Sequence, residues 1–187
     1  MKSKKFTKLS DLDNNSCQWY LKKFENQHHL MPVKVIELLN LLKEDREYSG
    51  INQMQHALQT ATFAINDSAS EEWVFAALCH DVGKVLSQEN HAAISAEFIK
   101  PYVSEACYRV VQSHEIFQGQ FYFDKVGKDP LKYKTFSNEI WYEMGLKFNE
   151  WDEKSFDPSM KTVSVNEMET YLETNNKKFP KSLKKVA

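Results

Sequence analysis

The stretch that decides the fold is ALCHDVGK, residues 77–84, in which a histidine and an aspartate stand side by side at the end of an apolar run. The run from Trp73 to Leu78 is typical of a buried helix, and Gly83 is a candidate stop signal. Neighbouring side chains on a helix diverge by about 100°. We therefore expect His80 and Asp81 at the helix end, where the backbone can turn both side chains inward.

The composition predicts one all-α domain. The chain has 187 residues, which is enough for a single domain with a substantial core. It has only five glycines and five prolines, many aromatic residues, and no segment in which polar and apolar residues alternate over the length of a strand.

Charge and cysteine content exclude several classes of partner. The 24 basic and 26 acidic residues give a net charge of −2, so no strong field indicates binding to nucleic acid or to an anionic membrane. No run reaches the roughly 18 apolar residues of a membrane span. The cysteines Cys17, Cys79 and Cys107 are odd in number and without a pattern, which predicts reduced thiols in a cytoplasmic protein, with Cys79 and Cys107 in the core.

Three regions are expected along the chain. Residues 1–30 form an N-terminal extension, in which a short helix around Trp19 docks onto the body, and residues 177–187 form a lysine-rich tail. Residues 31–176 form a helical bundle, with a loop at 116–128. Apolar spacing predicts its helices near residues 32–48, 52–65, 73–78, 89–100, 103–115, 129–148 and 164–176.

Four histidines in separate helical segments suggest a metal site. With two carboxylates, the candidate ligands are His56, His80, Asp81, His91, His114 and Asp152. Helical bundles build metal sites from inward-facing residues on different helices, and imidazole with carboxylate suits iron, manganese or zinc. Because a carboxylate can bridge two cations, Asp81 is the natural bridge of a two-metal site. Any one of these histidines alone is more often an ordinary buried or surface residue, as we expect for His28 and His29.

Three short stretches resemble those of the HD-domain superfamily, whose signature is H…HD…D on a helical bundle. They are YSGINQMQHALQTA (48–61), AALCHDVGK (76–84) and EWDEK (150–154), and the resemblance spans about residues 46–175. His91 and His114 are similar to the extra ligands of the dinuclear branch. Within that branch the chain most resembles the mixed-valent diiron oxygenases, which include myo-inositol oxygenase and the phosphonate-cleaving, PhnZ-like enzymes.

The resemblance implies a role for each candidate ligand. It places one iron on His56, His80, Asp81 and Asp152, and the other on Asp81, His91 and His114. It also implies that Tyr48 occupies an iron position until substrate displaces it, although a half-buried aromatic at a helix end is an equally good interpretation of Tyr48.

The residues implied to hold the substrate differ from those of the better-known relatives. The resemblance assigns the anionic end of a substrate to Lys84, Ser137, Gln118 and Asn149. Ser137 matches the phosphonate-cleaving enzymes, whereas the other three stand where those enzymes have different side chains. The chain also lacks a substrate-binding glutamate between Gly50 and Ile51. The exact substrate therefore does not transfer, although a lysine near two metals can hold an anion as a point charge.

The resemblance implies an oxygenase that uses two iron ions, Fe(II) and Fe(III), and O2 to cleave a small hydroxylated substrate, with a 1-hydroxyphosphonate as the expected substrate. The first alternative is a phosphohydrolase that uses manganese or other divalent metals on a phosphate ester or nucleotide, because the same ligands serve that chemistry. The second is a non-catalytic metal-binding module, which the complete ligand set disfavours. The sequence does not indicate an oligomeric state.

Overall fold

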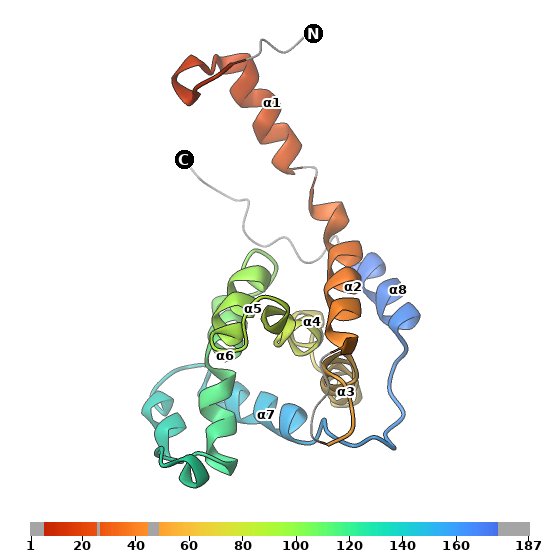
Figure 1. The fold of residues 1–187 in the computed structure, drawn as a ribbon, viewed down its shortest axis with the longest axis vertical. Coiled ribbons are helices and arrows are strands. Elements are labelled where there is room, and N and C mark those ends of the chain that lie inside the picture. The colour runs from red at the N-terminus through yellow and green to blue at the C-terminus, as the bar shows by residue number, and fades with distance from the viewer. Residues whose placement is uncertain (1–5, 26, 45–48, 176–187) are drawn as a thin grey trace.

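The computed structural model describes residues 6–25, 27–44 and 49–175 (Figure 1). Within these ranges the regular structure is helical, without a β-strand, which confirms the all-α prediction. The α-helices are α1 (Asn14–Glu25), α2 (Met31–Leu41), α3 (Gln53–Asn66), α4 (Glu71–Cys79), α5 (His91–Ile99), α6 (Glu105–Gln118), α7 (Tyr142–Glu153) and α8 (Val165–Asn175).

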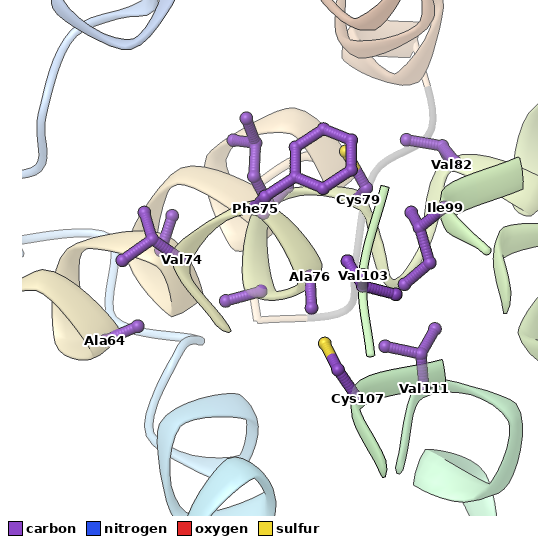
Figure 2. Close-up of a cluster of buried hydrophobic side chains, with 14 of the residues drawn as sticks. Ala64, Val74, Phe75, Ala76, Cys79, Val82, Ile99, Val103, Cys107 and Val111 are labelled. Atoms are coloured by element: carbon purple, nitrogen blue, oxygen red, sulfur yellow. The ribbon is translucent and has the colours of Figure 1, made fainter. Parts of the chain in front are cut away.

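Helix α4 lies at the centre of the bundle. From Val74 to its end at Cys79 every side chain is buried, as expected for a helix that is apolar all round. Figure 2 shows Ile99 of α5 and Cys107 of α6 close to α4 in this core. Cys79 and Cys107 are buried and Cys17 is exposed, which confirms the predicted distribution of the thiols.

Helix α1 forms as predicted but does not dock onto the bundle. Figure 1 shows it pointing away from the other helices. Trp19 and Phe24 are 54% and 61% exposed, and the ring nearest to Trp19 is that of its neighbour Tyr20, with centroids 4.9 Å apart. The aromatic cluster of this segment therefore packs within the helix, not against the body.

The prediction of one helix over residues 129–148 is wrong for the first half of that range. The chain forms a short 3-10 helix at Lys132–Phe136, and α7 starts only at Tyr142. The rings of Phe136 and Trp141 lie 5.0 Å apart, and both pack against Phe117 of α6. Aromatic packing between distant parts of the chain outweighs local helix propensity here.

The helices of the bundle pack in neighbouring pairs. Helix α3 packs on α4 and α7, while α6 packs on α5 and α7, and α8 lies beside α2 (Figure 1).

In the part of the chain that the structure describes, no helix has the length and apolar character needed to cross a membrane.

Candidate metal centre

The structure brings the six candidate ligands together in the interior. His56 comes from α3, His114 from α6 and Asp152 from α7, while His91 is the first residue of α5. His80 and Asp81 directly follow α4, and the change from helical to near-zero ψ at Asp81 turns both side chains inward. None of the six residues is more than 4% exposed.

Each of the four histidines has the same hydrogen bond on the outer side of its ring. The Nδ1 atoms lie 2.7–2.9 Å from a backbone carbonyl: Ser155 O for His56, Ala77 O for His80, Gln88 O for His91 and Val111 O for His114. Because a carbonyl can only accept, Nδ1 carries the proton, and Nε2 of the neutral ring presents a lone pair. All four lone pairs are thereby available to a cation.

The first half of the cluster contains His56, His80 and Asp152. Nε2 of His56 lies 3.1 Å from Nε2 of His80, and Oδ1 of Asp152 lies 3.0 Å and 3.5 Å from these two nitrogens. Oδ2 of Asp81 completes this half at 3.5 Å from His56 and 3.4 Å from His80.

The second half contains His91 and His114, whose Nε2 atoms are 3.3 Å apart. Oδ1 of Asp81 lies 3.1 Å from Nε2 of His91 and 3.4 Å from Nε2 of His114. Asp81 therefore faces one half with each carboxylate oxygen, which is the arrangement of a bridging ligand.

The arrangement fits two metal ions that share Asp81. Lone pairs that face one another repel, and Oδ1 of Asp81 and Oδ1 of Asp152 are buried without a hydrogen-bond donor among the described residues. Two donors that each lie about 2.1 Å from one metal are about 3.0 Å apart at right angles and about 3.4 Å apart at the tetrahedral angle. The separations in the cluster, 3.0–3.5 Å, match this range to within 0.1 Å, and the nitrogen and oxygen donors suit iron, manganese or zinc.

Both aspartates are held as carboxylates. Burial raises the pKa of Asp81, but the neighbouring His80 and Lys84 outweigh it and hold the pKa well below its usual value. Burial likewise opposes ionisation of Asp152, but the neighbouring His80 and His56 outweigh it and lower the pKa of this carboxyl group. Each side chain therefore offers negatively charged oxygens to a cation.

Lys84 places a positive charge at the cluster. Its Nζ lies 2.8 Å from Oδ2 of Asp81 and donates a hydrogen bond to Oε1 of Gln53 at 3.1 Å. Gln53 was not among the sequence candidates, although it precedes His56 by three residues and therefore shares its helix face. The two contacts place the ammonium group of Lys84 next to the candidate ligand Asp81.

The other predicted substrate residues are placed differently. Gln118 donates from Nε2 to Oδ2 of Asp152 at 2.5 Å, so it contacts the cluster. Asn149 is buried one turn before Asp152 on α7, and its Oδ1 has no donor among the described residues. Ser137 is exposed, and in the described part of the chain no hydrogen bond joins its side chain to the cluster. Tyr48 lies outside the described residues.

A segment that sequence analysis missed supports the first half of the cluster. Residues 155–163, here called the strap, follow α7 and cross α3. The Ser155 carbonyl accepts from His56, and the Phe156 ring stacks on the His56 ring at a centroid distance of 4.5 Å. Gln59 holds the strap by donating to Asp157 O and accepting from Asp157 N, at 2.6 and 3.1 Å.

Gly83 has a different role from the helix stop that was expected. Helix α4 already ends at Cys79, and Gly83 lies in a 3-10 helix, Val82–Val85. A Cβ atom at Gly83 would lie 2.3 Å from the backbone oxygen of His91, so only glycine permits this close approach. Its N–H donates to Oγ of Ser95, which ties the 3-10 helix to α5.

Comparison with known families agrees with this geometry. No curated protein matches the chain with significant similarity. The family model described as HD domain matches residues 32–141, which is more than half of the chain. The matched region contains five of the six candidate ligands, and Asp152 lies beyond its end. The chain therefore belongs to the HD domain family.

Proposed function

We propose that this protein is a diiron oxygenase that uses O2 to cleave a small hydroxylated substrate, and that the substrate is a 1-hydroxyphosphonate whose carbon–phosphorus bond is broken. Membership of the HD domain family and the buried histidine–aspartate cluster indicate the broader class, a metal-dependent enzyme. The observation that carries the proposal is the carboxylate of Asp81, which presents one oxygen to each pair of histidines.

The donor set supports iron and leaves room for substrate. Imidazole and carboxylate bind both oxidation states of iron, and no cysteine belongs to the cluster. Four protein donors face the first position and three face the second, so both positions can accept oxygens of a substrate. The iron pair, when bound, supplies the redox chemistry with O2. The resemblance of residues 48–61, 76–84 and 150–154 to the diiron oxygenases supports the same assignment.

The residues of this chain orient the reactants. Lys84 holds the anionic end of the substrate, and Gln118 fixes the rotation of the Asp152 carboxylate. Phe148 is fully buried and meets the His80 ring edge-on, which excludes water from the core side of the cluster. Ser137 and Asn149 are proposed as further substrate contacts.

Tyr48 is proposed as the group that substrate displaces from an iron position. This role rests on the resemblance of the stretch 48–61, because the residue itself lies outside the described ranges.

A phosphohydrolase is the second candidate. Hydrolysis of phosphate esters is typical of the HD superfamily, and Lys84 beside the cluster suits a phosphate as well as a phosphonate. In that case two divalent ions such as manganese activate water for attack on a phosphate ester or a nucleotide.

Metal content and oxygen consumption separate the two candidates. The oxygenase proposal predicts two irons per chain, a mixed-valent signal in electron paramagnetic resonance, and oxygen uptake when a 1-hydroxyphosphonate is added. An iron-free protein with a manganese- or magnesium-dependent phosphodiesterase activity would overturn it in favour of the hydrolase.

A further inference from the structure

A cavity of about 310 Å³ lies beside the metal cluster. Its volume is in the range of small-molecule binding sites. The residues that line it are Gln118, Phe121, Tyr122, Glu153 and Phe156. The lining contains no metal ligand and not Lys84, and it shares only Gln118 and Phe156 with the site described above.

Two of the lining residues connect the cavity to the first half of the cluster. Gln118 donates to Asp152, and the Phe156 ring lies on the His56 ring. Tyr122 lies close enough to the cluster to be affected by its charge: burial and the nearby charges of Glu115 and Asp152 raise the pKa of its phenol. The cavity therefore lies next to the candidate metal position of His56 and Asp152, with the Gln118 side chain and the Phe156 ring between them.

The cavity wall is aromatic. The side chains of Phe121, Tyr122 and Phe156 are 46%, 39% and 36% exposed. Burial of such large apolar side chains would stabilise the folded protein. Single exposed aromatics are common on protein surfaces, but three that converge on one cavity next to a buried cluster indicate a binding site. The rings offer flat faces on which a planar or apolar group can stack.

Local packing holds these rings in place. Tyr122 packs edge-on against Phe123, at 5.1 Å between centroids. The Phe123 ring fills the space in front of Gly119, where a Cβ atom would lie 2.4 Å from it. Phe156 belongs to the strap, where its ring stacks on His56 and the neighbouring Asp157 is held by Gln59. Two of the three rings are therefore held by contacts within the protein.

We propose that this cavity is the specificity site of the metal centre and takes an uncharged aromatic or apolar substituent of the substrate. The inference rests on the proposed function in one respect, that the anionic head of the substrate binds at the cluster and Lys84. Glu153 forms no ion pair with any described residue and places a negative charge at the cavity, which disfavours a substituent with a second anionic group. The substrate class is therefore an aryl- or alkyl-substituted phosphonate or phosphate.

Binding of two non-reacting phosphonates to the metal-loaded protein tests this inference. Phenylphosphonate and methylphosphonate share the anionic head, and neither has a carbinol carbon or an ester bond, so neither the oxidative nor the hydrolytic chemistry affects the result. In calorimetric titrations we expect phenylphosphonate to bind at least about tenfold more tightly, because its ring buries apolar area in the cavity.

Phe121→Ala identifies the site of this preference, because Phe121 lines the cavity, is 46% exposed and is not one of the six candidate ligands. The variant should lose most of the preference for the phenyl compound and keep its metal content and its affinity for methylphosphonate. Ile140→Ala is the matched control, since Ile140 is 97% exposed and lies outside the cavity. It should behave as the unmodified protein.

Three results would overturn the inference: equal affinity for the two compounds, no measurable binding of either, or an equal loss of affinity for both in Phe121→Ala. None of these results bears on iron content or oxygen uptake. Conversely, a hydrolytic activity would overturn the oxygenase and leave the preference for the phenyl group intact.

Discussion

Oδ1 of Asp81 and Nε2 of His91 lie 3.1 Å apart, and in a neutral imidazole ring whose proton is on Nδ1 neither atom has a hydrogen to share. The ring of His91 keeps its proton on the opposite nitrogen, and the pKa of Asp81 is held low. Such a contact is repulsive until a cation enters it. The other oxygen of Asp81 makes the corresponding contact with His56, so one side chain joins two cation positions.

Asp81→Ala is expected to abolish binding of both metals, whereas His91→Ala should remove only one. Alanine at position 81 takes a donor from each half of the cluster, while alanine at 91 leaves the half with His56, His80 and Asp152 complete. Metal analysis of the purified variants measures the stoichiometry. Asp81→Ala protein that keeps one tightly held metal with intact activity would contradict the bridging role.

Removal of metal should lower the melting temperature. Because the ligands converge only in the folded chain, a bound metal stabilises the native state by mass action, by about 2.7 kcal/mol at a free concentration one hundred times its Kd. For a chain of this size this corresponds to roughly 5–10 °C. Calorimetry before and after chelation, followed by readdition of metal, measures the shift. An unchanged melting temperature would show that the cluster binds no metal.

Gln59→Met should weaken metal binding in the first half of the cluster only. The substitution releases Asp157 and loosens the strap, so the Ser155 carbonyl no longer holds His56 in its ligating orientation. Loss of such outer-shell support typically costs roughly 10–100-fold in metal affinity. A two-step metal titration should show one weakened site and one unchanged site.

Thr62→Val is the matched control for the Gln59 variant. Thr62 lies on the same helix and accepts a hydrogen bond from the strap at Val163, farther from His56. The Thr62→Val variant should have a lower free energy of unfolding and an unchanged affinity for both metals. If both variants weakened the binding of both metals equally, the strap would have only a general structural role.

Lys84→Met should raise KM for an anionic substrate by roughly 10–100-fold, the range for loss of a charged hydrogen bond. In the unmodified protein, Nζ of Lys84 lies 2.8 Å from the carboxylate of Asp81. The substitution removes this cation and leaves all six candidate ligands in the sequence. Steady-state kinetics measures the effect, with metal content determined in parallel. Lys147→Met is the control, because Lys147 pairs with Asp67 on the surface of α7. Unchanged KM in Lys84→Met would exclude Lys84 from substrate binding.

One thiol should react quickly and two slowly with a thiol reagent at pH 8. Cys17 is exposed, whereas Cys79 and Cys107 are buried. Burial raises the pKa of the Cys79 thiol, so the reactive thiolate is scarce at this pH. Colorimetric titration of native and denatured protein gives the two rates, and Cys17→Ser should remove the fast phase. Rapid reaction of all three thiols in the native protein would contradict the buried core around α4.

The six candidate ligands could be named from the sequence because polar, metal-binding residues stand out in apolar helical patterns. His56 and His114 lie within such patterns, and His80 and Asp81 end one. Their convergence needed the packing of the helices, which periodicity alone does not specify. The strap was missed because its contacts with α3 join residues 98 or more positions apart, as in the hydrogen bonds of Gln59 with Asp157.

The aromatic cavity was missed for a related reason. Phe121 and Tyr122 fall in a segment that the sequence marks only as a loop, and Phe156 follows α7 without a pattern. Likewise, the helix expected at 129–148 was interrupted by ring contacts with Phe117, which no local signal announces. Short-range rules identified the helices with regular apolar spacing, and failed where distant side chains determine the backbone.

The absence of a side chain at Gly83 determines how closely the start of α5 approaches the residues that follow Asp81. The space that a side chain would need at this position is taken by the backbone of His91, the residue that opens the second cation position. A larger residue must shift either the start of α5 or the 3-10 helix that follows Asp81. Gly83 therefore acts as a spacer of minimal thickness: the separation of the two halves of the cluster depends on a residue that is not itself a candidate ligand.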